Sequence, residues 1–332
     1  MLAAPDGRVV ATTDFLLEGR HFRRDWSSGA DAGHKAAVRS LADLAAMGAE
    51  PTGLLLALAA PPDLPVSWAR DLARGLAAEA ARAGAAVVGG DTSRAQSVLL
   101  AVTGLGSLAG RDPVLRSGAA PGDVVAVAGP LGHAAAGLAL LTAGVRENPL
   151  VREHLRPMPP YEAGPEAAGL GATAMIDVSD GLVADLGHIA HASGVLIDLD
   201  PDRLRPGPGQ LAAATDLFSG RTGGLHATAS PASPAEQALA WVLTGGEDHS
   251  LAATFPPGTR LPARWRIIGT VKPRPAQPRP ADAGAADDRM PEARTAQARA
   301  GRSGSGDVVV GGQPWGEPTG WDHFAAGKPK TP

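Results

Sequence analysis

Short apolar segments alternate with longer segments of helical periodicity along most of this chain, and this alternation restricts the fold to the α/β class. Within residues 33–48, the apolar residues Ala37, Leu41 and Leu44 recur at helical spacing and fall on one face. The first third is predicted to contain helices over 33–48 and 67–83 and strands over 54–58, 85–88 and 97–106.

The alternation starts again at Gly118, with a turn and a strand in PGDVVAVAG. Further helices are predicted over 131–142, 163–170 and 180–192, and further strands over 174–178, 195–199, 249–255, 266–271 and 308–310. We therefore expect two α/β domains, residues 1–115 and 116–324, followed by a frayed tail over 325–332.

Residues 272–307 differ in composition from the rest of the second half. They contain no Val, Ile, Leu or aromatic residue and are rich in Pro, Ala, Arg and Asp. Such a segment cannot bury enough apolar surface to offset the entropy of ordering it, so a disordered insertion is predicted.

The beginning of the chain predicts a hairpin. Asp6-Gly7 is a two-residue turn signal, and the strand after it would include Val9 to Thr12. The partner strand would lie before Pro5, where only four residues stand. We expect either a very short hairpin or a strand that this sequence lacks.

Composition excludes several classes of function. The formal charge of −4 provides no basic field for nucleic acid, and the absence of Cys excludes disulfides, thiolate metal sites and cysteine nucleophiles. No apolar run reaches the ~18 residues of a membrane span, and no secretory signal is recognisable, so a cytoplasmic protein is expected. The sequence also lacks the P-loop pattern GxxxxGK[ST] and the nucleophile elbow GxSxG.

Acidic residues stand at strand ends or in glycine-rich turns, where α/β proteins place ligands. Glycine lets backbone N–H groups approach phosphate oxygens, and Asp carboxylates suit Mg²⁺. Asp43, inside an apolar helix, is a further potential ligand. The four motifs are Thr12-Thr13-Asp14, Gly89-Gly90-Asp91, Asp177-Val178-Ser179-Asp180-Gly181 and Gly245-Gly246-Glu247-Asp248.

Taken singly, each motif also has a purely structural explanation. A Gly-Gly-Asp sequence is most often a turn, Asp180 can cap the helix that follows it, and Asp43 can lie on a solvated helix face. His188 and His191 stand three residues apart without a nearby carboxylate cluster, which favours surface or packing roles. The residues alone therefore indicate a multi-carboxylate α/β protein that binds Mg²⁺ and phosphate.

The order of the motifs resembles thiamine-monophosphate kinase, a family within the superfamily of aminoimidazole ribonucleotide synthetase-like ATP-binding proteins. The resemblance runs from about Val9 to Thr270, with a weaker match at TGWDHF over 319–324. EGRHF and AMIDVSDGL point to this member of the superfamily. The matching segments are ATTDFLLEGRHF, KAAVRSLADLAAMGAEPTGLLLALAAP, AVVGGDTSR, VTGLG, RSGAAPGDVVAVAGPLGHAAAGL, ATAMIDVSDGLVADLGHIAHASGV and LTGGEDHSL.

The resemblance implies a two-domain homodimer that transfers the γ-phosphoryl group of ATP to thiamine monophosphate, with several Mg²⁺ ions. The acceptor is already an anionic phosphate oxygen, so no strong general base is needed, and direct in-line transfer is expected. By similarity, Mg²⁺ is bound by Thr12, Thr13, Asp14, Asp43, Asp91, Asp177 and Asp180; ATP by Gly90, Asp91, Arg116 and Ser179; and thiamine monophosphate by His21, Glu247 and Trp321. The alternative role for Trp321 is that of a C-terminal packing anchor.

Two departures from the family pattern leave other functions open. The family carries a Gly-Asp-Asp segment on a strand before the motif matched at Thr12, and this sequence starts too late to contain it. The 272–307 segment is also longer than the family pattern. The alternatives are a catalytically impaired homologue that binds nucleotide or thiamine phosphate, and a synthetase of the same superfamily that acts on a ribonucleotide amide.

Overall fold

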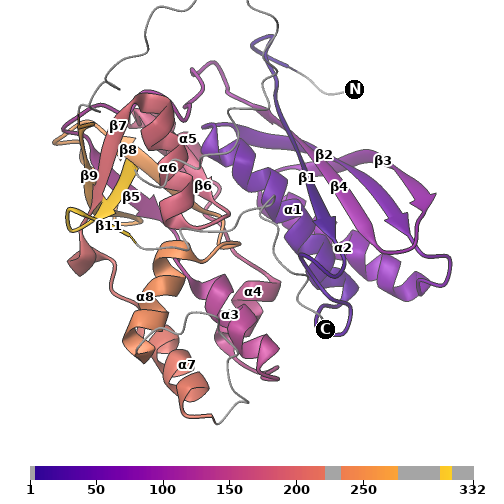
Figure 1. Ribbon diagram of the computed structural model, residues 1–332. Coiled ribbons are helices and arrows are strands. Elements are labelled where there is room, and N and C mark those ends of the chain that lie inside the picture. Colours follow the sequence, from indigo (N-terminus) through magenta and orange to yellow (C-terminus); the bar gives the residue numbers. More distant parts are fainter. Residues whose placement is uncertain (1–3, 221–232, 276–306, 316–332) are drawn as a thin grey trace, which may run out of the picture.

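The computed structural model describes residues 4–220, 233–275 and 307–315, and these residues form two β-sheets with helices packed against them (Figure 1). The α/β class predicted from the sequence is confirmed. The first sheet has the order β1-β4-β2-β3. Its strands are β1 (Val10–Leu17), β2 (Glu50–Ala60), β3 (Ala86–Arg94) and β4 (Leu99–Ser107).

Helices α1 (Gly29–Ala46) and α2 (Val66–Arg82) pack against the first sheet, α1 on β1 and β4 and α2 on β3. Side chains alternate between the two faces of a strand, so Thr12, Asp14 and the buried Leu16 lie on one face of β1. Thr13 and Phe15 lie on the opposite face and are exposed. The alternation therefore decides which residues of the TTD motif approach α1.

The second sheet has seven strands in the order β11-β10-β7-β9-β5-β8-β6. Its edge strand β6 pairs antiparallel with β8. The strands are β5 (Val124–Ala128), β6 (Ala174–Val178), β7 (Val195–Leu199), β8 (Ser250–Phe255), β9 (Trp265–Pro273), β10 (Val308–Val310) and β11 (Gln313–Pro314).

Two groups of helices accompany the second sheet. Helix α6 (Leu182–Ser193) buries its apolar face in the same core cluster as β5, β6 and β7. A separate apolar cluster joins four helices that extend away from the sheet (Figure 1). These are α3 (His133–Thr142), α4 (Pro149–Leu155), α7 (Pro208–Phe218) and α8 (Pro234–Thr244); α5 (Ala163–Gly169) and the short 3₁₀ turn η1 (Pro201–Arg203) complete the described helices.

Helix α1 lies between the two sheets, because it contacts β6 and β8 of the second sheet as well as the first. Leu41 on α1 and Phe255 on β8 belong to one continuous buried cluster. Most residues of α1 are buried, which explains why the segment is apolar over so much of its circumference. Charged side chains on the buried part of α1 therefore need partners across the junction.

Several predicted boundaries are confirmed and others are wrong. Strands were predicted at 174–178, 195–199 and 308–310, and β6, β7 and β10 occupy these residues. The first helix starts at Gly29 rather than 33, because Ser28 forms a capping box with Asp31. The prediction that Asp180 caps the following helix is wrong, because Gly181 occupies the N-cap position and Asp185 accepts the loop N–H groups.

Helices α4, α7 and α8 were missed. All three have Pro in the first turn, which reads as a loop signal in sequence but is well tolerated at a helix N-terminus.

The predicted turn at Asp6-Gly7 is present, but the strand that follows is β1, and it pairs with β4. Within the described residues β1 has no hairpin partner before it.

Part of the prediction for 272–307 is wrong. Lys272 and Pro273 belong to β9 and pair with β7, and Arg274 forms an ion pair with Asp307 at 2.8 Å. Residues 276–306, Trp321 and the predicted tail at 325–332 lie outside the described residues. Within the described part of the chain, no helix is long and apolar enough to cross a membrane.

Candidate active site

Helix α1 presents three charged residues at intervals of four, Lys35, Arg39 and Asp43. Residues spaced by four lie on one stripe of a helix, so the two cations and the carboxyl share a face. Lys35 Nζ lies 3.1 Å from Glu247 Oε2, and Arg39 Nη1 lies 2.6 Å from Glu247 Oε1. The stripe therefore joins the first sheet's helix to the GGED motif of the second half.

The loop containing the GGED motif is bound to the loop after β6. Glu247 N–H donates to the Ser179 carbonyl at 2.8 Å, and His249 N–H donates to the Val178 carbonyl at 2.9 Å. A Cβ on Gly246 would lie 2.4 Å from the Ser179 carbonyl oxygen, so only glycine permits this approach. The close approach places Glu247 beside the second acidic motif.

Glu247 and His249 have φ values of 70° and 53°, in the left-handed region that non-glycine residues rarely adopt. Such conformations persist where surrounding contacts hold them, and they concentrate at functional sites. Here the two backbone bonds to residues 178–179 hold the loop in that conformation.

Carboxyl groups from three elements face the same region. Asp43 Oδ2 accepts a hydrogen bond from Thr12 Oγ1 at 2.6 Å. Burial and, after it, the neighbouring charges of Asp177 and Asp14 together raise the pKa of Asp43 to about 8. The three carboxyls therefore repel one another, and a cation among them would relieve that repulsion.

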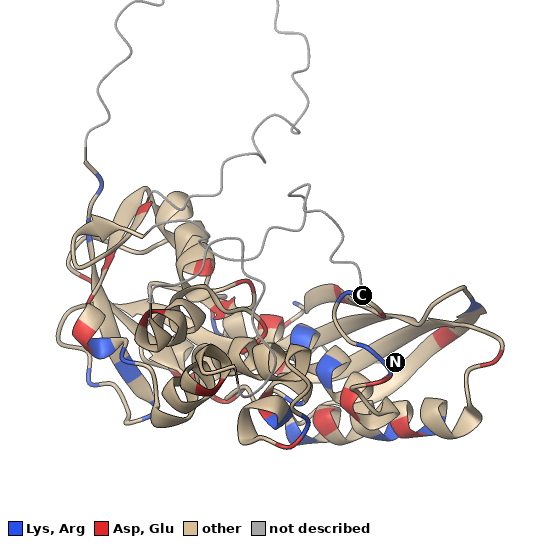
Figure 2. Ribbon diagram, turned by 60° about the horizontal axis from the view of Figure 1, so that its bottom comes forward, with Lys and Arg blue, Asp and Glu red and all other residues tan. Residues whose placement is uncertain are grey.

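We call Asp14, Lys35, Arg39, Asp43, Asp177 and Glu247 the junction cluster; in Figure 2, acidic and basic residues lie near one another in the middle of the molecule. Burial alone would raise the pKa of Glu247, but Lys35 and Arg39 hold it well below its ordinary value. Glu247 is therefore a carboxylate. Burial lowers the pKa of His21 to about 4, and the Arg39 charge adds to this effect, so His21 is neutral.

Unsatisfied polar atoms concentrate at the junction cluster. Buried polar groups in proteins are almost always hydrogen-bonded, so a group of exceptions in one place indicates a ligand site. Within residues 4–220, 233–275 and 307–315, buried side-chain atoms without a hydrogen-bond partner lie in or beside this cluster: Asp14 Oδ2, His21 Nε2, Arg39 Nε and His249 Nε2, while Glu247 Oε2 has only the ion pair with Lys35.

The loop after β6 is supported from below by Asp185. One oxygen of this buried carboxyl accepts hydrogen bonds from the backbone N–H groups of Ser179, Asp180 and Gly181, each at 3.0 Å. Asp248, beside Glu247, accepts from the backbone N–H groups of Gly132 and Ala134 at the start of α3. These two carboxyls organise backbone, while their neighbours face the site.

Not all of the predicted site residues come together. Thr13 lies on the opposite face of β1, where its hydroxyl donates to the Val102 carbonyl at 3.3 Å. Gly90 shares a row with Asp14 through Val102 and Leu56, so three strand spacings, about 14 Å, separate them. The expectation that Asp91 converges with the other carboxyls is wrong for a single chain, because β3 is the far edge of the sheet.

Arg116 is exposed and lies near α6, where its charge lowers the pKa of His188, after the larger effect of burial. His188 and His191 are exposed on α6, as expected. Trp321 lies outside the described residues. The described residues contain no group of three or more His, Asp or Glu side chains close enough to hold a metal ion. The carboxyl convergence is thus looser than a preformed metal site.

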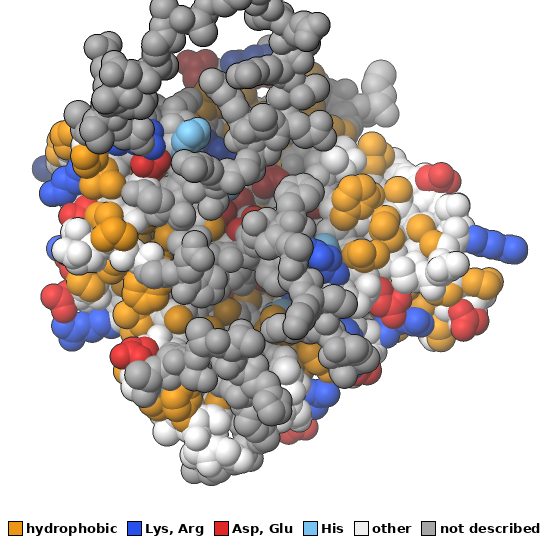
Figure 3. Space-filling model, viewed as in Figure 1, with side chains coloured by type: hydrophobic (Ala, Val, Ile, Leu, Met, Phe, Trp, Pro, Cys, Tyr) orange, Lys and Arg blue, Asp and Glu red, His pale blue; other side chains and the backbone are white. Residues whose placement is uncertain are grey.

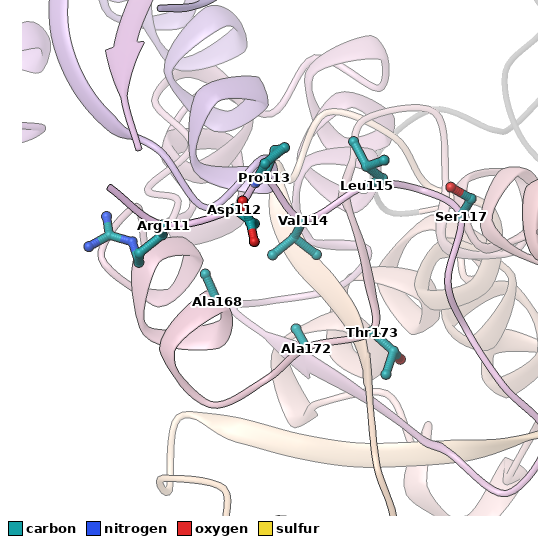
Figure 4. A pocket seen from close by; sticks show the side chains of 9 residues that line it. All are labelled: Arg111, Asp112, Pro113, Val114, Leu115, Ser117, Ala168, Ala172 and Thr173. Atoms are coloured by element: carbon teal, nitrogen blue, oxygen red, sulfur yellow. The ribbon is translucent and has the colours of Figure 1, made fainter. Parts of the chain in front are cut away.

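The chain also has a cavity of about 450 Å³ away from the junction cluster (Figure 4). It lies between the segment joining the two halves and α5, and it contains none of the predicted site residues. Its lining residues are Arg111, Asp112, Pro113, Val114, Leu115, Ser117, Ala168, Ala172 and Thr173.

Sequence reasoning missed Lys35, Arg39, His249 and Asp185, and it gave Asp248 no role of its own within the GGED motif. The spacing of Lys35, Arg39 and Asp43 was a usable signal, since three charges on one stripe of an apolar helix require partners. His249 Nδ1 lies 3.1 Å from Asp177 Oδ2, and both side chains are buried. No local pattern could have revealed that contact, because it joins residues 72 positions apart.

Comparisons with known proteins show the family to which the chain belongs. Residues 1–108 match the family described as AIR synthase related protein, N-terminal domain, and residues 120–248 match its C-terminal domain. The thiamine-monophosphate kinase of Mycobacterium tuberculosis (strain ATCC 25618 / H37Rv) is 46% identical over 278 residues, covering 83% of this chain and 78% of that protein. The chain belongs to the thiamine-monophosphate kinase family.

Other members of the thiamine-monophosphate kinase family support the assignment. The thiamine-monophosphate kinase of Corynebacterium glutamicum is 40% identical, covering 81% of this chain and 78% of that protein. Thiamine monophosphate kinase from Aquifex aeolicus superposes with a TM-score of 0.70 at 31% identity, covering 81% of this chain and 86% of that one. A solved complex of AaThiL with AMPPCP and TMP superposes with a TM-score of 0.75 at 28% identity, covering 97% of this chain and 89% of that one.

Proposed function

We propose that this protein transfers the γ-phosphoryl group of ATP to the phosphate of thiamine monophosphate, giving thiamine diphosphate and ADP. Family membership supports the reaction, and the similar AaThiL was solved with AMPPCP and TMP. The structural observation that carries the proposal is the junction cluster, where buried and half-buried carboxyls, the cations of Lys35 and Arg39, and unsatisfied polar atoms meet between two sheets.

The junction cluster suits a reaction between two phosphorylated molecules. Lys35 and Arg39 supply positive charge for phosphate oxygens, and catalysis of phosphoryl transfer rests mainly on positioning and electrostatic stabilisation. The acceptor is already an anionic oxygen, so the chain needs no strong base. The neutral His21, whose Nδ1 accepts from Leu17 N–H, keeps its Nε2 available for a substrate. We propose direct in-line transfer.

Divalent magnesium fits the donor set of the junction cluster. Mg²⁺ takes oxygen ligands and is usually bound by one or two carboxylates together with substrate phosphates. Asp14 Oδ2 is buried without a partner, and Asp43 and Asp177 repel each other in the absence of a cation. We propose that Thr12, Asp14, Asp43, Asp177 and Asp180 hold the ions, which would neutralise charge between the two substrates when bound.

The remaining contacts are proposed by similarity. Arg116 and Ser179 would bind ATP, and His21, Glu247 and Trp321 would bind thiamine monophosphate. Gly90 and Asp91 have no support as ATP ligands beside these residues within a single chain, since β3 is the far edge of the first sheet. Thr13 has no support as a side-chain ligand beside Asp14, since it faces the other way. We also propose two domains, residues 1–115 and 116–324, and a cytoplasmic location.

A homodimer is proposed from the open face of the first sheet. Phe15 is 58% exposed, and Leu55, which shares a cross-strand row with Thr13, is an exposed apolar residue of the same face. Figure 3 shows hydrophobic side chains gathered over this part of the molecule. Contiguous exposed apolar surface on a soluble protein indicates a partner, and here a second copy of the chain is the partner proposed.

The test is ADP formation with ATP, Mg²⁺ and thiamine monophosphate, each omitted in turn. We expect turnover only with all three present. Asp177→Asn should lower kcat on the order of 100-fold or more, because a charge that positions the reacting phosphates is lost. Asp71→Asn, on the exposed surface of α2, is the matched control and should retain activity.

Two other outcomes would contradict the proposal. Binding of ATP and thiamine monophosphate in a calorimeter without any ADP would show a non-catalytic homologue. Turnover with a ribonucleotide amide in place of thiamine monophosphate would show a synthetase.

A further inference from the structure

Arg39 occupies a position that no predicted role explains. Its side chain is 11% exposed and reaches two carboxyls that belong to different sheets. Nη1 donates to Glu247 Oε1 at 2.6 Å, and Nη2 lies 3.9 Å from Asp14 Oδ1. Asp14 stands on β1 of the first sheet, whereas Glu247 stands in the loop before β8 of the second.

Neutralisation of Glu247 alone does not account for Arg39. Lys35, one helical turn earlier and 4% exposed, already forms an ion pair with Glu247 Oε2 at 3.1 Å. A simple buried ion pair would also satisfy its hydrogen-bonding atoms, yet Arg39 Nε and Asp14 Oδ2 lack hydrogen-bond partners. Arg39 therefore adds a link between the two carboxyls and leaves donor and acceptor positions open.

The guanidinium group suits such a link. It is planar and always charged, and it presents several donors in a fixed geometry, whereas a lysine ammonium is a point charge on a flexible stem. Arg39 also projects from α1, which is packed against both sheets and therefore cannot move independently of either. A side chain anchored on α1 can hold Asp14 and Glu247 at a constant separation.

We propose that Arg39 is a positioning residue that fixes the Glu247 carboxylate relative to Asp14 across the junction between the two sheets. Resting on the proposed function, this means that Arg39 aligns the bound thiamine monophosphate with the phosphoryl group it receives. Correct alignment converts a two-molecule reaction into one within a single complex, and small misplacements are costly in rate.

The test compares Arg39→Met and Arg39→Lys with the unmodified enzyme in steady-state kinetics with each substrate varied. Both variants should raise KM for thiamine monophosphate about tenfold and lower kcat at least tenfold, with KM for ATP within twofold of the unmodified enzyme. Lysine should not rescue, because one ammonium cannot contact both carboxyls.

Arg82→Met is the matched control, since Arg82 also pairs with a buried glutamate, Glu79, but lies outside the junction cluster. Arg82→Met should lower the midpoint of thermal unfolding and leave KM for thiamine monophosphate and KM for ATP both unchanged. Unchanged kinetics in Arg39→Met, or full rescue by Arg39→Lys, would overturn the proposal.

A folding defect is distinguished by the double variant Arg39→Met with Glu247→Gln. If Arg39 acts through Glu247, the double variant should be no slower than Glu247→Gln alone, whereas multiplying losses would contradict the proposal. An unmodified enzyme that forms no ADP would instead contradict the proposed function, so the two failures are separate.

Discussion

At the scale of single residues, the site is organised by unequal treatment of chemically similar carboxyls. Glu247 is paired with two cations and stays ionised, whereas Asp43 is buried among other carboxyls and its pKa is raised to about 8. Asp185 and Asp248 accept hydrogen bonds from backbone N–H groups. Environment, rather than residue type, separates groups that bind ligands from groups that shape loops.

The raised pKa of Asp43 makes the stability of the metal-free protein depend on pH. Between the ordinary value of 3.8 and about 8, the folded chain retains a proton that the unfolded chain releases, so stability falls as pH rises through this window. Asp43→Asn should therefore be more stable than the unmodified protein at pH 8 by about 1–3 kcal/mol, and this difference should be smaller at pH 5.

Urea unfolding in EDTA at the two pH values measures this difference, with Asp71→Asn as the exposed control. The same Asp43→Asn variant should lose kinase turnover. Equal stability of variant and unmodified protein at pH 8 would show that Asp43 carries no repulsion.

Asp185 illustrates a supporting residue whose loss should affect both stability and activity. One oxygen of its carboxyl accepts hydrogen bonds from three backbone N–H groups of the loop that contains Ser179 and Asp180. Asp185→Ala should cost about 2–4 kcal/mol in unfolding free energy, because buried donors lose their acceptor, and should also reduce kcat. Urea unfolding and initial rates measure both. Loss of stability with normal kcat would show that the loop geometry does not depend on Asp185.

At the scale of elements, helix α4 is fixed to α3 by a buried histidine. His154 Nδ1 lies 3.0 Å from the Ala134 carbonyl oxygen, and as a donor it completes a bond between the two helices. Burial lowers the pKa of His154 to about 3, and the Lys35 charge contributes. The helix pair therefore requires the neutral ring.

This requirement predicts acid sensitivity. Between the ordinary value of 6.5 and about pH 3, the unfolded chain binds a proton at this histidine whereas the folded chain does not. Stability therefore falls as the pH falls through this window, by at most about 1.4 kcal/mol per pH unit. His154→Asn, which retains a donor but does not titrate, should flatten the decline between pH 6 and pH 4. Thermal melts across this range test it against His191→Asn on the exposed face of α6. Parallel curves for His154→Asn and the unmodified protein would contradict the assignment.

At the scale of the whole molecule, α1 packs between the two sheets. The face of the first sheet opposite α1 is therefore the surface available to a partner. Phe15→Asp places a charge on the edge strand β1 of that face and should convert the proposed dimer to a monomer. Sedimentation equilibrium measures the mass. Val66→Asp, at an equally exposed apolar position at the start of α2, should leave it unchanged. A monomeric unmodified protein would contradict the dimer.

The sequence by itself determined the α/β class, most strand positions and the order of acidic motifs, because these depend on local periodicity and turn chemistry. It also determined the resemblance that comparison confirmed. It could not show that Thr12 and Thr13 face opposite ways relative to α1, since strand alternation has meaning only once one face is covered.

Only the tertiary structure decided which motifs meet. Asp14 and Asp91 look equivalent in sequence, yet they lie on opposite edge strands of one sheet. Asp177, by contrast, lies near Asp43 although it belongs to the other sheet. The same folding brings Arg39 between Asp14 and Glu247, 208 positions apart from the latter. Long-range packing of α1 against both sheets sets these distances, and no local pattern encodes it.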